Sequence, residues 1–221
     1  VTVSMSPAWL PKSGSSFDLS IALGILIAHQ VIPQEPLDST VVLGELALDG
    51  KIRSVRGVLP ALIAAYQAGI TRAVIPLSNR VEAQLMPQMQ ILAFENLHHV
   101  LQWMRTGVNP ELQELDLEHT EQDSYLDFQD VAGQSKARFA AEVAATGGHH
   151  LLLIGPPGAG KTMIASRIPS IMPALTIDQA LAVTAVHSIS GALGSRSPMS
   201  LLAPIISPHH TASRVSIVGG G

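Results

Sequence analysis

The chain contains no cysteine among its 221 residues, and charged side chains make up only 14% of it. The lack of thiols excludes disulfides, thiolate metal sites and catalytic cysteines. The formal net charge is −4, so the composition does not provide the basic surface typical of nucleic-acid-binding proteins. Contact with DNA would therefore require a local patch or residues outside this chain.

Long hydrophobic runs are also absent. The longest apolar run, Leu19 to Ala28, is interrupted by Ser20 and is too short to cross a bilayer. The beginning of the chain lacks the basic and then apolar pattern of a signal peptide. We therefore expect a cytoplasmic protein that does not associate with a membrane.

Apolar side chains are nevertheless plentiful, because hydrophobic residues make up 47% of the sequence. This content supports real cores, and the length suffices for one large or two ordinary domains. Val1 is not an initiator methionine, and the chain ends in three glycines, Gly219 to Gly221. From these two ends we expect an internal fragment of a longer protein.

The most informative stretch begins with two histidines and joins a short apolar run, residues 151–154, to a glycine-rich turn. The run predicts a strand, and the turn reads Gly155, Pro156, Pro157, Gly158, Ala159, Gly160, Lys161 and Thr162. A strand, this turn and a helix, in that order, are typical of a phosphate-binding loop. Glycines let the backbone curl so that its N–H groups point at phosphate oxygens, and the helix start adds free amide donors. The sequence therefore predicts that these eight residues bind a nucleoside triphosphate.

Two residues of this turn have separate expected roles. Lys161 can reach the outer phosphates as a positive charge, and the Thr162 hydroxyl can ligate magnesium. The predicted cofactors are thus ATP and Mg²⁺. A helical pattern continues through Ile164, Ile168 and Ile171, and Pro169 is expected to end or kink that helix.

Residues 1–104 show the alternating patterns of an α/β domain. We expect strands at 1–5, 41–48, 73–76 and 90–94, and helices at 17–29, 61–67, 79–85 and 97–105. Asp49-Gly50 is a hairpin signal before Lys51 to Arg53. Pro60 is expected to open its helix, and Gly69 to cap the end of it.

Four motifs in this part resemble the proteolytic domain of the Lon proteases: residues 11–16, 43–52, 57–62 and 68–70. The resemblance implies a Lon-protease-like (ribosomal S5 domain 2-like) α/β domain over residues 1–105. In that family a lysine deprotonates the catalytic serine. Ser16 falls on the nucleophile position, but the lysine position falls on Ala61. The resemblance therefore implies no peptidase activity, and we interpret Ser16 as a relic or a helix N-cap.

Residues 106–124 contain Gly107, Asn109, Pro110 and a cluster of acidic residues, which we interpret as a linker. A docking site for a basic partner is the alternative. The following segment, residues 127–134, ends in Val131-Ala132-Gly133-Gln134 and precedes a helical pattern at 135–145. Placed one helix before the glycine-rich turn, it resembles the start of an AAA+ ATPase module at 125–221. In that family the backbone of residues 131–134 would lie against adenine.

A Lon-like domain without its lysine, joined to an AAA+ module, is similar to the YifB/ComM proteins, bacterial AAA+ ATPases related to the magnesium-chelatase ATPase subunit. Residues 207–213, with Pro208-His209-His210-Thr211, and the terminal glycines match that group. The arginines that usually precede this segment are replaced by Pro204-Ile205-Ile206. The resemblance implies a hexameric, ATP-driven motor that moves on DNA and promotes branch migration during recombination of incoming DNA. The Walker B, sensor and arginine-finger positions would lie outside the chain, and we expect this fragment to be inactive.

Two other functions stay open. One is a subunit that drives metal insertion into a tetrapyrrole, as in magnesium chelatase, although chelatase subunits lack the Lon-like domain. The other is a nucleotide-gated binding module without motor activity. A metal site at either histidine pair is less favoured: His149 and His150 would point to opposite faces of a strand, and His209-His210 has no cysteine or carboxylate nearby. We interpret both pairs as structural or polar contacts.

Overall fold

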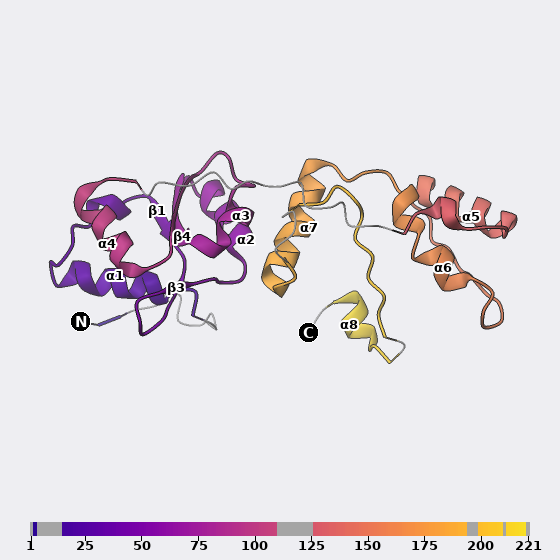
Figure 1. Ribbon diagram of the computed structural model, residues 1–221, viewed down its shortest axis with the longest axis horizontal. Coiled ribbons are helices and arrows are strands. Elements are labelled where there is room, and N and C mark those ends of the chain that lie inside the picture. Colours follow the sequence, from indigo (N-terminus) through magenta and orange to yellow (C-terminus); the bar gives the residue numbers. More distant parts are fainter. Residues whose placement is uncertain (1, 4–14, 110–125, 194–198, 210, 220–221) are drawn as a thin grey trace. The chain divides into compact units, whose positions relative to one another are not determined.

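A computed structural model describes residues 2–3, 15–109, 126–193, 199–209 and 211–219 (Figure 1). Contacts within the chain divide it into two units, Val1–Thr120 with Leu181–Met199, and Glu121–Ala180 with Ser200–Gly221. Of the expected strand at 1–5 only residues 2–3 are described, and they are not assigned to a strand; most of the expected linker falls outside the described residues. Since residues 181–199 group with the first unit, a single domain over 125–221 stays a prediction.

The first unit is built on a three-stranded parallel sheet. Strands β1 (Thr40–Val42), β4 (Arg72–Pro76) and β5 (Gln90–Phe94) pair in the order β1-β4-β5. Parallel neighbours require crossover connections, and helices supply them here. The register places Val42 opposite Val74, and Val74 opposite Leu92. The expected α/β class of this part of the chain is thus confirmed.

Four α-helices cover the two faces of this sheet: α1 (Asp18–Ala28), α2 (Val58–Gln67), α3 (Arg80–Ala83) and α4 (Leu97–Thr106). Successive residues of a strand point to opposite faces. Ala73 and Ile75 of β4 belong to a buried cluster with residues of α2 and α3, whereas Val74 belongs to a second cluster with residues of α1 and α4. Helices α2 and α3 therefore cover one face and α1 and α4 the other (Figure 1).

The single strand expected at 41–48 was wrong, because the structure divides it in two. β1 ends at Val42, and β2 (Glu45–Leu46) pairs antiparallel with β3 (Ile52–Arg53) in a separate sheet. The hairpin between β2 and β3 confirms the Asp49-Gly50 turn, since Gly50 has a φ of 84°. The pattern of apolar residues therefore predicted extended chain in this range, but it did not predict the interruption between β1 and β2.

The break lies at Gly44. Its N–H donates to the Ser16 carbonyl at 3.0 Å, and its carbonyl accepts from the Leu19 N–H at 3.0 Å. A Cβ at this position would lie 2.9 Å from Ile52 Cγ2 and 3.2 Å from Leu19 Cδ2. The backbone thus bonds to the start of α1 instead of continuing the ladder, and only a glycine fits this close approach.

Helix α2 begins at Val58, two residues before the expected start, with Gly57 as its N-cap. Pro60 is its third residue, and the helix tolerates it because the N–H groups of the first turn have no intrahelical acceptor. Gly69 follows the end of α2 with a φ of 83°, which confirms the expected termination. The expected helix at 79–85 is shortened to a 3₁₀ turn, η2 (Leu77–Asn79), and the four-residue α3.

A buried polar network joins three segments of the first unit. Glu82 is 7% exposed, and its carboxylate accepts from the Asn79 side-chain amide at 2.7 Å and from the Leu59 N–H at 3.2 Å. The third donor is the hydroxyl of Ser188, in α7 (Ile177–Ser190), at 2.6 Å. Three neutral donors thus satisfy the side-chain oxygens of Glu82, as buried polar groups require.

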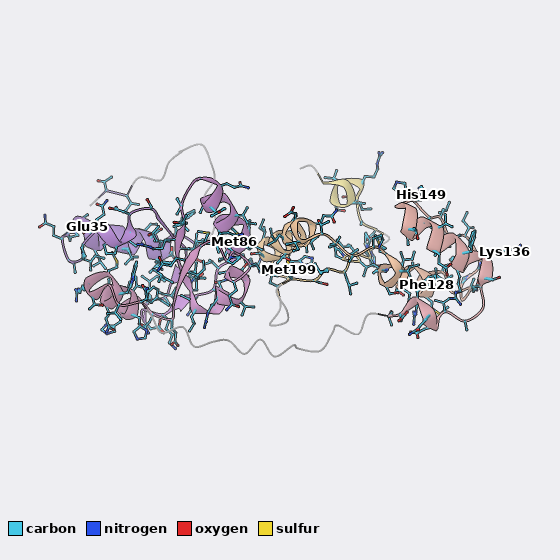
Figure 2. All side chains as sticks on the ribbon, turned by 90° about the horizontal axis from the view of Figure 1, so that it is seen from above. Glu35, Met86, Phe128, Lys136, His149 and Met199 are labelled. Carbon is cyan, nitrogen blue, oxygen red and sulfur yellow. The ribbon has the colours of Figure 1, made fainter. Side chains whose placement is uncertain are left out.

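The second unit contains α5 (Ser135–Gly147), α6 (Lys161–Ala165), α8 (Arg214–Val218) and the 3₁₀ turns η3 (Phe128–Asp130) and η4 (Ile168–Ile171). Its buried cluster consists of Phe128, Val131, Ala141 and Ile164. Phe128 is labelled in Figure 2. The helix expected at 135–145 is confirmed as α5. No helix in the described parts of either unit is long and apolar enough to cross a membrane.

Two local predictions in this unit need correction. Residues 149–154 form no strand, because no described segment exchanges ladder hydrogen bonds with them. Their alternation persists, since Leu151 and Leu153 pack on the cluster while Leu152 and Ile154 are 80% and 86% exposed. The helix after the loop is only five residues long, and Pro169 lies in η4, where the chain leaves the α-helical path as expected.

Candidate functional site

The glycine-rich turn leads directly into α6. Gly158 and Gly160 have φ values of 79° and 80°, which glycine adopts without strain. The Ala159 N–H donates to the Pro156 carbonyl at 3.3 Å and closes the turn. Gly160 is the N-cap of α6. All eight residues expected to bind phosphate therefore lie in one continuous loop and the first two positions of a helix.

The loop offers backbone donors to a ligand. The N–H groups of Gly160, Lys161 and Thr162 find no acceptor within the described ranges of the chain. Pro156 and Pro157 carry no N–H, so the donors gather at the end of the loop that enters α6. Successive free N–H groups on such a turn form a concave anion-binding surface.

The ammonium of Lys161 is folded back on its own loop. Its Nζ donates to the carbonyl oxygens of Gly155 and Pro156 at 2.8 Å and 2.7 Å. An ammonium group has three donors, and a phosphate oxygen is a stronger acceptor than a carbonyl oxygen because it is charged. The side chain therefore lies where an incoming phosphate would draw it away from these carbonyls.

Thr162 is exposed at the second position of α6. Across the residues that the structure describes, no acceptor or donor pairs with its hydroxyl, although its carbonyl accepts from the Ser166 N–H at 2.9 Å. The same residues contain no group of three histidine, aspartate or glutamate side chains that could hold a metal ion by themselves. A magnesium ion at Thr162 would therefore need oxygen ligands from a bound phosphate as well.

The segment before α5 is fixed on the core of the same unit. Val131 is fully buried, and the Phe128 N–H donates to Ser170 Oγ at 2.9 Å. The guanidinium of Arg138 donates to the Val131 carbonyl at 3.1 Å and lies 5.8 Å from the centre of the Phe128 ring. These contacts hold residues 128–131 in place ahead of the helix.

Gln134 connects that segment to the loop. Its side-chain amide donates to the Ala159 carbonyl at 2.9 Å, across 25 residues of sequence. Sequence reasoning assigned only a backbone role to this residue and missed the contact. A cavity of about 460 Å³ lies beside it, lined by Gly133, Gln134, Ser135, Arg138, Phe139 and Glu142. The structure therefore brings the segment expected at adenine next to the loop expected at the phosphates.

Ser16 and Ala61, which fall on the expected Lon-like catalytic positions, both lie within the described residues. The N-cap of α1 is Phe17, so the expectation that Ser16 caps this helix was wrong. The Ser16 backbone carbonyl instead accepts the hydrogen bond from the Gly44 N–H, and α1 begins after Phe17. Ala61 is half-buried, and its methyl group packs on the apolar cluster below α2.

One residue of each histidine pair, His149 and His209, makes a local polar contact. The His149 N–H donates to the Ala144 carbonyl at 2.9 Å, at the end of α5. Nδ1 of His209 lies 2.7 Å from Thr211 Oγ1. His210, Gly220 and Gly221 lie outside the described residues, as do Pro11 to Gly14 of the Lon-like motif. In the segment that replaces the arginines, Ile205 and Ile206 are 52% and 81% exposed.

Comparison with protein families gives two matches that together cover most of the chain. Residues 127–221 match a family described as magnesium chelatase, subunit ChlI. Residues 1–79 match a family described as subunit ChlI of Mg-chelatase. The glycine-rich turn lies within the match over residues 127–221, whereas strands β1 and β4 of the first unit lie within the match over residues 1–79.

Individual relatives match along the whole chain. An uncharacterized protein of Mycobacterium tuberculosis is 45% identical over 223 residues, which are 100% of this chain and 44% of the relative. The competence protein ComM of Haemophilus influenzae is 36% identical and YifB of Escherichia coli 35%, again over 100% of this chain and over 44% and 43% of the relatives. The chain therefore spans less than half the length of these relatives.

A Lon protease also matches. Lon protease 2 of Bacillus subtilis is 32% identical over 97 residues, which are 43% of this chain and 17% of that protease. This similarity agrees with the Lon-like motifs and with an α/β unit built on a parallel sheet.

Proposed function

Because the chain belongs to the YifB/ComM family of magnesium chelatase-like proteins, we propose that residues Gly155 to Thr162 bind ATP together with Mg²⁺. The observation that carries this proposal is the loop end, where three backbone N–H groups without a described acceptor adjoin an ammonium and a hydroxyl. These groups fit a triphosphate and its cation.

Each residue of the loop then has a defined role. The N–H groups of Gly160, Lys161 and Thr162 bind phosphate oxygens, and the Lys161 ammonium exchanges its two carbonyl partners for the outer phosphates. The Thr162 hydroxyl ligates magnesium. Bound ATP supplies a phosphoanhydride whose hydrolysis releases free energy, and this chain holds and orients it.

For the complete protein we propose an ATP-driven motor on DNA. It would act in the cytoplasm as a homo-hexamer and promote branch migration during recombination of incoming DNA. The support is the family membership, which includes a protein named as a competence protein, and the chelatase-type match over the P-loop unit. The formal charge of −4 still requires that DNA contacts come from a local patch or from residues outside this chain.

A magnesium-chelatase-type subunit is the second candidate. Both family matches carry that description, and one of them covers residues 1–79. The amino-terminal region therefore does not argue against a chelatase function, contrary to the expectation from the sequence. A nucleotide-gated binding module without motor activity is the third candidate, because the described residues account for phosphate binding alone.

The test of nucleotide binding is Lys161→Ala in the full-length protein. We expect ATP affinity to fall at least about a hundredfold, since a charged contact to phosphate is lost, while circular dichroism melting stays unchanged. Lys136→Ala is the matched control, because Lys136 is an exposed lysine on α5 whose removal changes the charge equally. Equal ATP affinity in Lys161→Ala and in the parent protein would refute the assignment.

The same preparation separates the three candidates. Hydrolysis stimulated by branched DNA supports the motor, and ATP-dependent insertion of magnesium into a porphyrin supports the chelatase-type subunit. ATP binding without turnover under both conditions supports the binding module. Each activity is measured beside Lys161→Ala, so that a contaminating ATPase is recognised.

A further inference from the structure

The contact between Gln134 and Ala159 has no part in the phosphate-binding pattern, yet it reaches the centre of the loop. It is a side-chain bond of 2.9 Å to a backbone carbonyl, and Ala159 lies immediately before the glycine that caps α6. Gln134 is exposed, so the bond is not a by-product of core packing.

The anchor of this bond is a residue with an uncommon backbone conformation. Gln134 has a φ of 53°, in the left-handed region that few residues other than glycine adopt, and it follows Gly133, whose φ is 69°. Its own carbonyl accepts from the Arg138 N–H at 2.9 Å and so begins α5. The side chain therefore projects from a fixed position at the junction of the segment and the helix.

The other end of the bond is the peptide unit between Ala159 and Gly160. The Ala159 carbonyl and the Gly160 N–H belong to one planar trans peptide, so they point in opposite directions. Gly160 has no Cβ to oppose a flip of this unit. When Gln134 holds the carbonyl on its own side, the Gly160 N–H must face the other way.

We propose that Gln134 is a positioning residue for the P-loop: its amide holds the Ala159–Gly160 peptide in the orientation that directs the Gly160 N–H at a bound phosphate. This inference rests on the proposed nucleotide binding. The orienting role belongs to the Gln134 side chain, so the segment before α5 contributes to the affinity for phosphate.

The test is Gln134→Met in the full-length protein, which keeps the length of the side chain and removes the donor. Gln129→Met is the control, because Gln129 is an exposed glutamine of the same segment and only its backbone N–H has a described hydrogen bond, to Asp127. The affinity for ADP is measured by titration of a fluorescent analogue, and the affinity for inorganic tripolyphosphate by competition.

For Gln134→Met we expect both affinities to fall by the same factor, about five- to tenfold, the change that one neutral hydrogen bond supports. Tripolyphosphate has no adenine, so its loss locates the effect at the phosphates. In turnover, KM for ATP should rise by that factor while kcat stays within about twofold, because the N–H is used in the ground and transition states alike. A bond that serves folding alone would change neither the two ligand affinities nor KM.

The outcomes separate the two proposals. If ADP binds the parent protein and Lys161→Ala abolishes binding, but Gln134→Met binds like Gln129→Met, the role of Gln134 is refuted and the P-loop stands. If Gln134→Met weakens ADP and leaves tripolyphosphate unchanged, the residue acts on the base, which also refutes the inference. If the parent binds neither ligand, both proposals fail.

Discussion

Asn79 and Val55 exchange two hydrogen bonds: the Asn79 amide donates to the Val55 carbonyl at 2.9 Å, and its Oδ1 accepts from the Val55 N–H at 3.0 Å. The side chain thus takes the place of a neighbouring strand for one residue that belongs to no ladder. The same amide also donates to Glu82, so a single buried side chain satisfies three polar groups.

Replacing this side chain should destabilise the first unit strongly. Asn79→Ala would leave both backbone groups of Val55 and one Glu82 oxygen without their partner, which we expect to cost about 3 kcal/mol in the free energy of unfolding. Urea denaturation measures this change. Gln84→Ala, at an exposed position after α3, is the control and should change stability by less than about 0.5 kcal/mol. A similar small change for both variants would contradict the role of the network.

Gly44 should be the least replaceable glycine of the first unit. Gly44→Ala places a methyl group 2.9 Å from Ile52 Cγ2, on a branched side chain that cannot move aside, and should cost about 2 kcal/mol. Gly24→Ala is the internal comparison, because Gly24 lies within α1 and a Cβ there meets nothing within 4 Å. The free energy of unfolding of that variant should rise by about 0.5–1 kcal/mol, because alanine has a higher helix propensity than glycine. Thermal melts of the two variants should therefore shift in opposite directions.

The Thr162 hydroxyl should matter only when magnesium is present. In Thr162→Ala the affinity for ATP should fall about tenfold in Mg²⁺, by loss of one oxygen ligand, and stay unchanged in excess EDTA. Thr162→Ser keeps the hydroxyl and should bind like the parent protein. An equal loss in EDTA would show that the residue contacts the nucleotide and not the cation.

The amino-terminal region should have no peptidase activity. Ala61 stands where a catalytic base would be needed, so the full-length protein should not cleave a fluorogenic peptide or casein, with or without ATP. Ser16→Ala should leave nucleotide affinity unchanged, since Ser16 belongs to the other unit. Peptide cleavage that disappears in Ser16→Ala would overturn this prediction.

Periodicity in the sequence was a good guide to elements that pack locally. Helices α1, α4 and α5 and strands β4 and β5 follow the expected ranges within a few residues, because each buries an apolar face that its own pattern reveals. The wrong prediction of one strand at 41–48 came from long-range contacts. The break at Gly44 depends on Ser16, Leu19 and Ile52, which no local pattern places nearby.

The candidate site also has a part that the sequence predicts and a part that it does not. Residues 155–162 were predicted from their spacing, because a phosphate cradle is a local backbone device, and the structure places them in one turn that enters α6. The role of the Gln134 side chain was not predicted. Its contact depends on the left-handed backbone conformation of Gln134 itself and on an acceptor 25 residues later in the sequence. A glutamine following a glycine at the start of a helix was the only available signal.

Among the described residues of the second unit, the buried cluster contains four residues, and one of them, Ala141, is small. So thin a core gives this unit little protection against local opening. Without nucleotide, the amides of α5 should exchange with deuterium by sub-global unfolding, far faster than those of α2, whose side chains belong to a twelve-residue cluster. Part of the free energy of ligand binding would then be consumed in ordering the unit. Across a series of variants in the cluster around Phe128, nucleotide affinity and the hydrogen-exchange protection of the α5 amides should therefore change in the same direction.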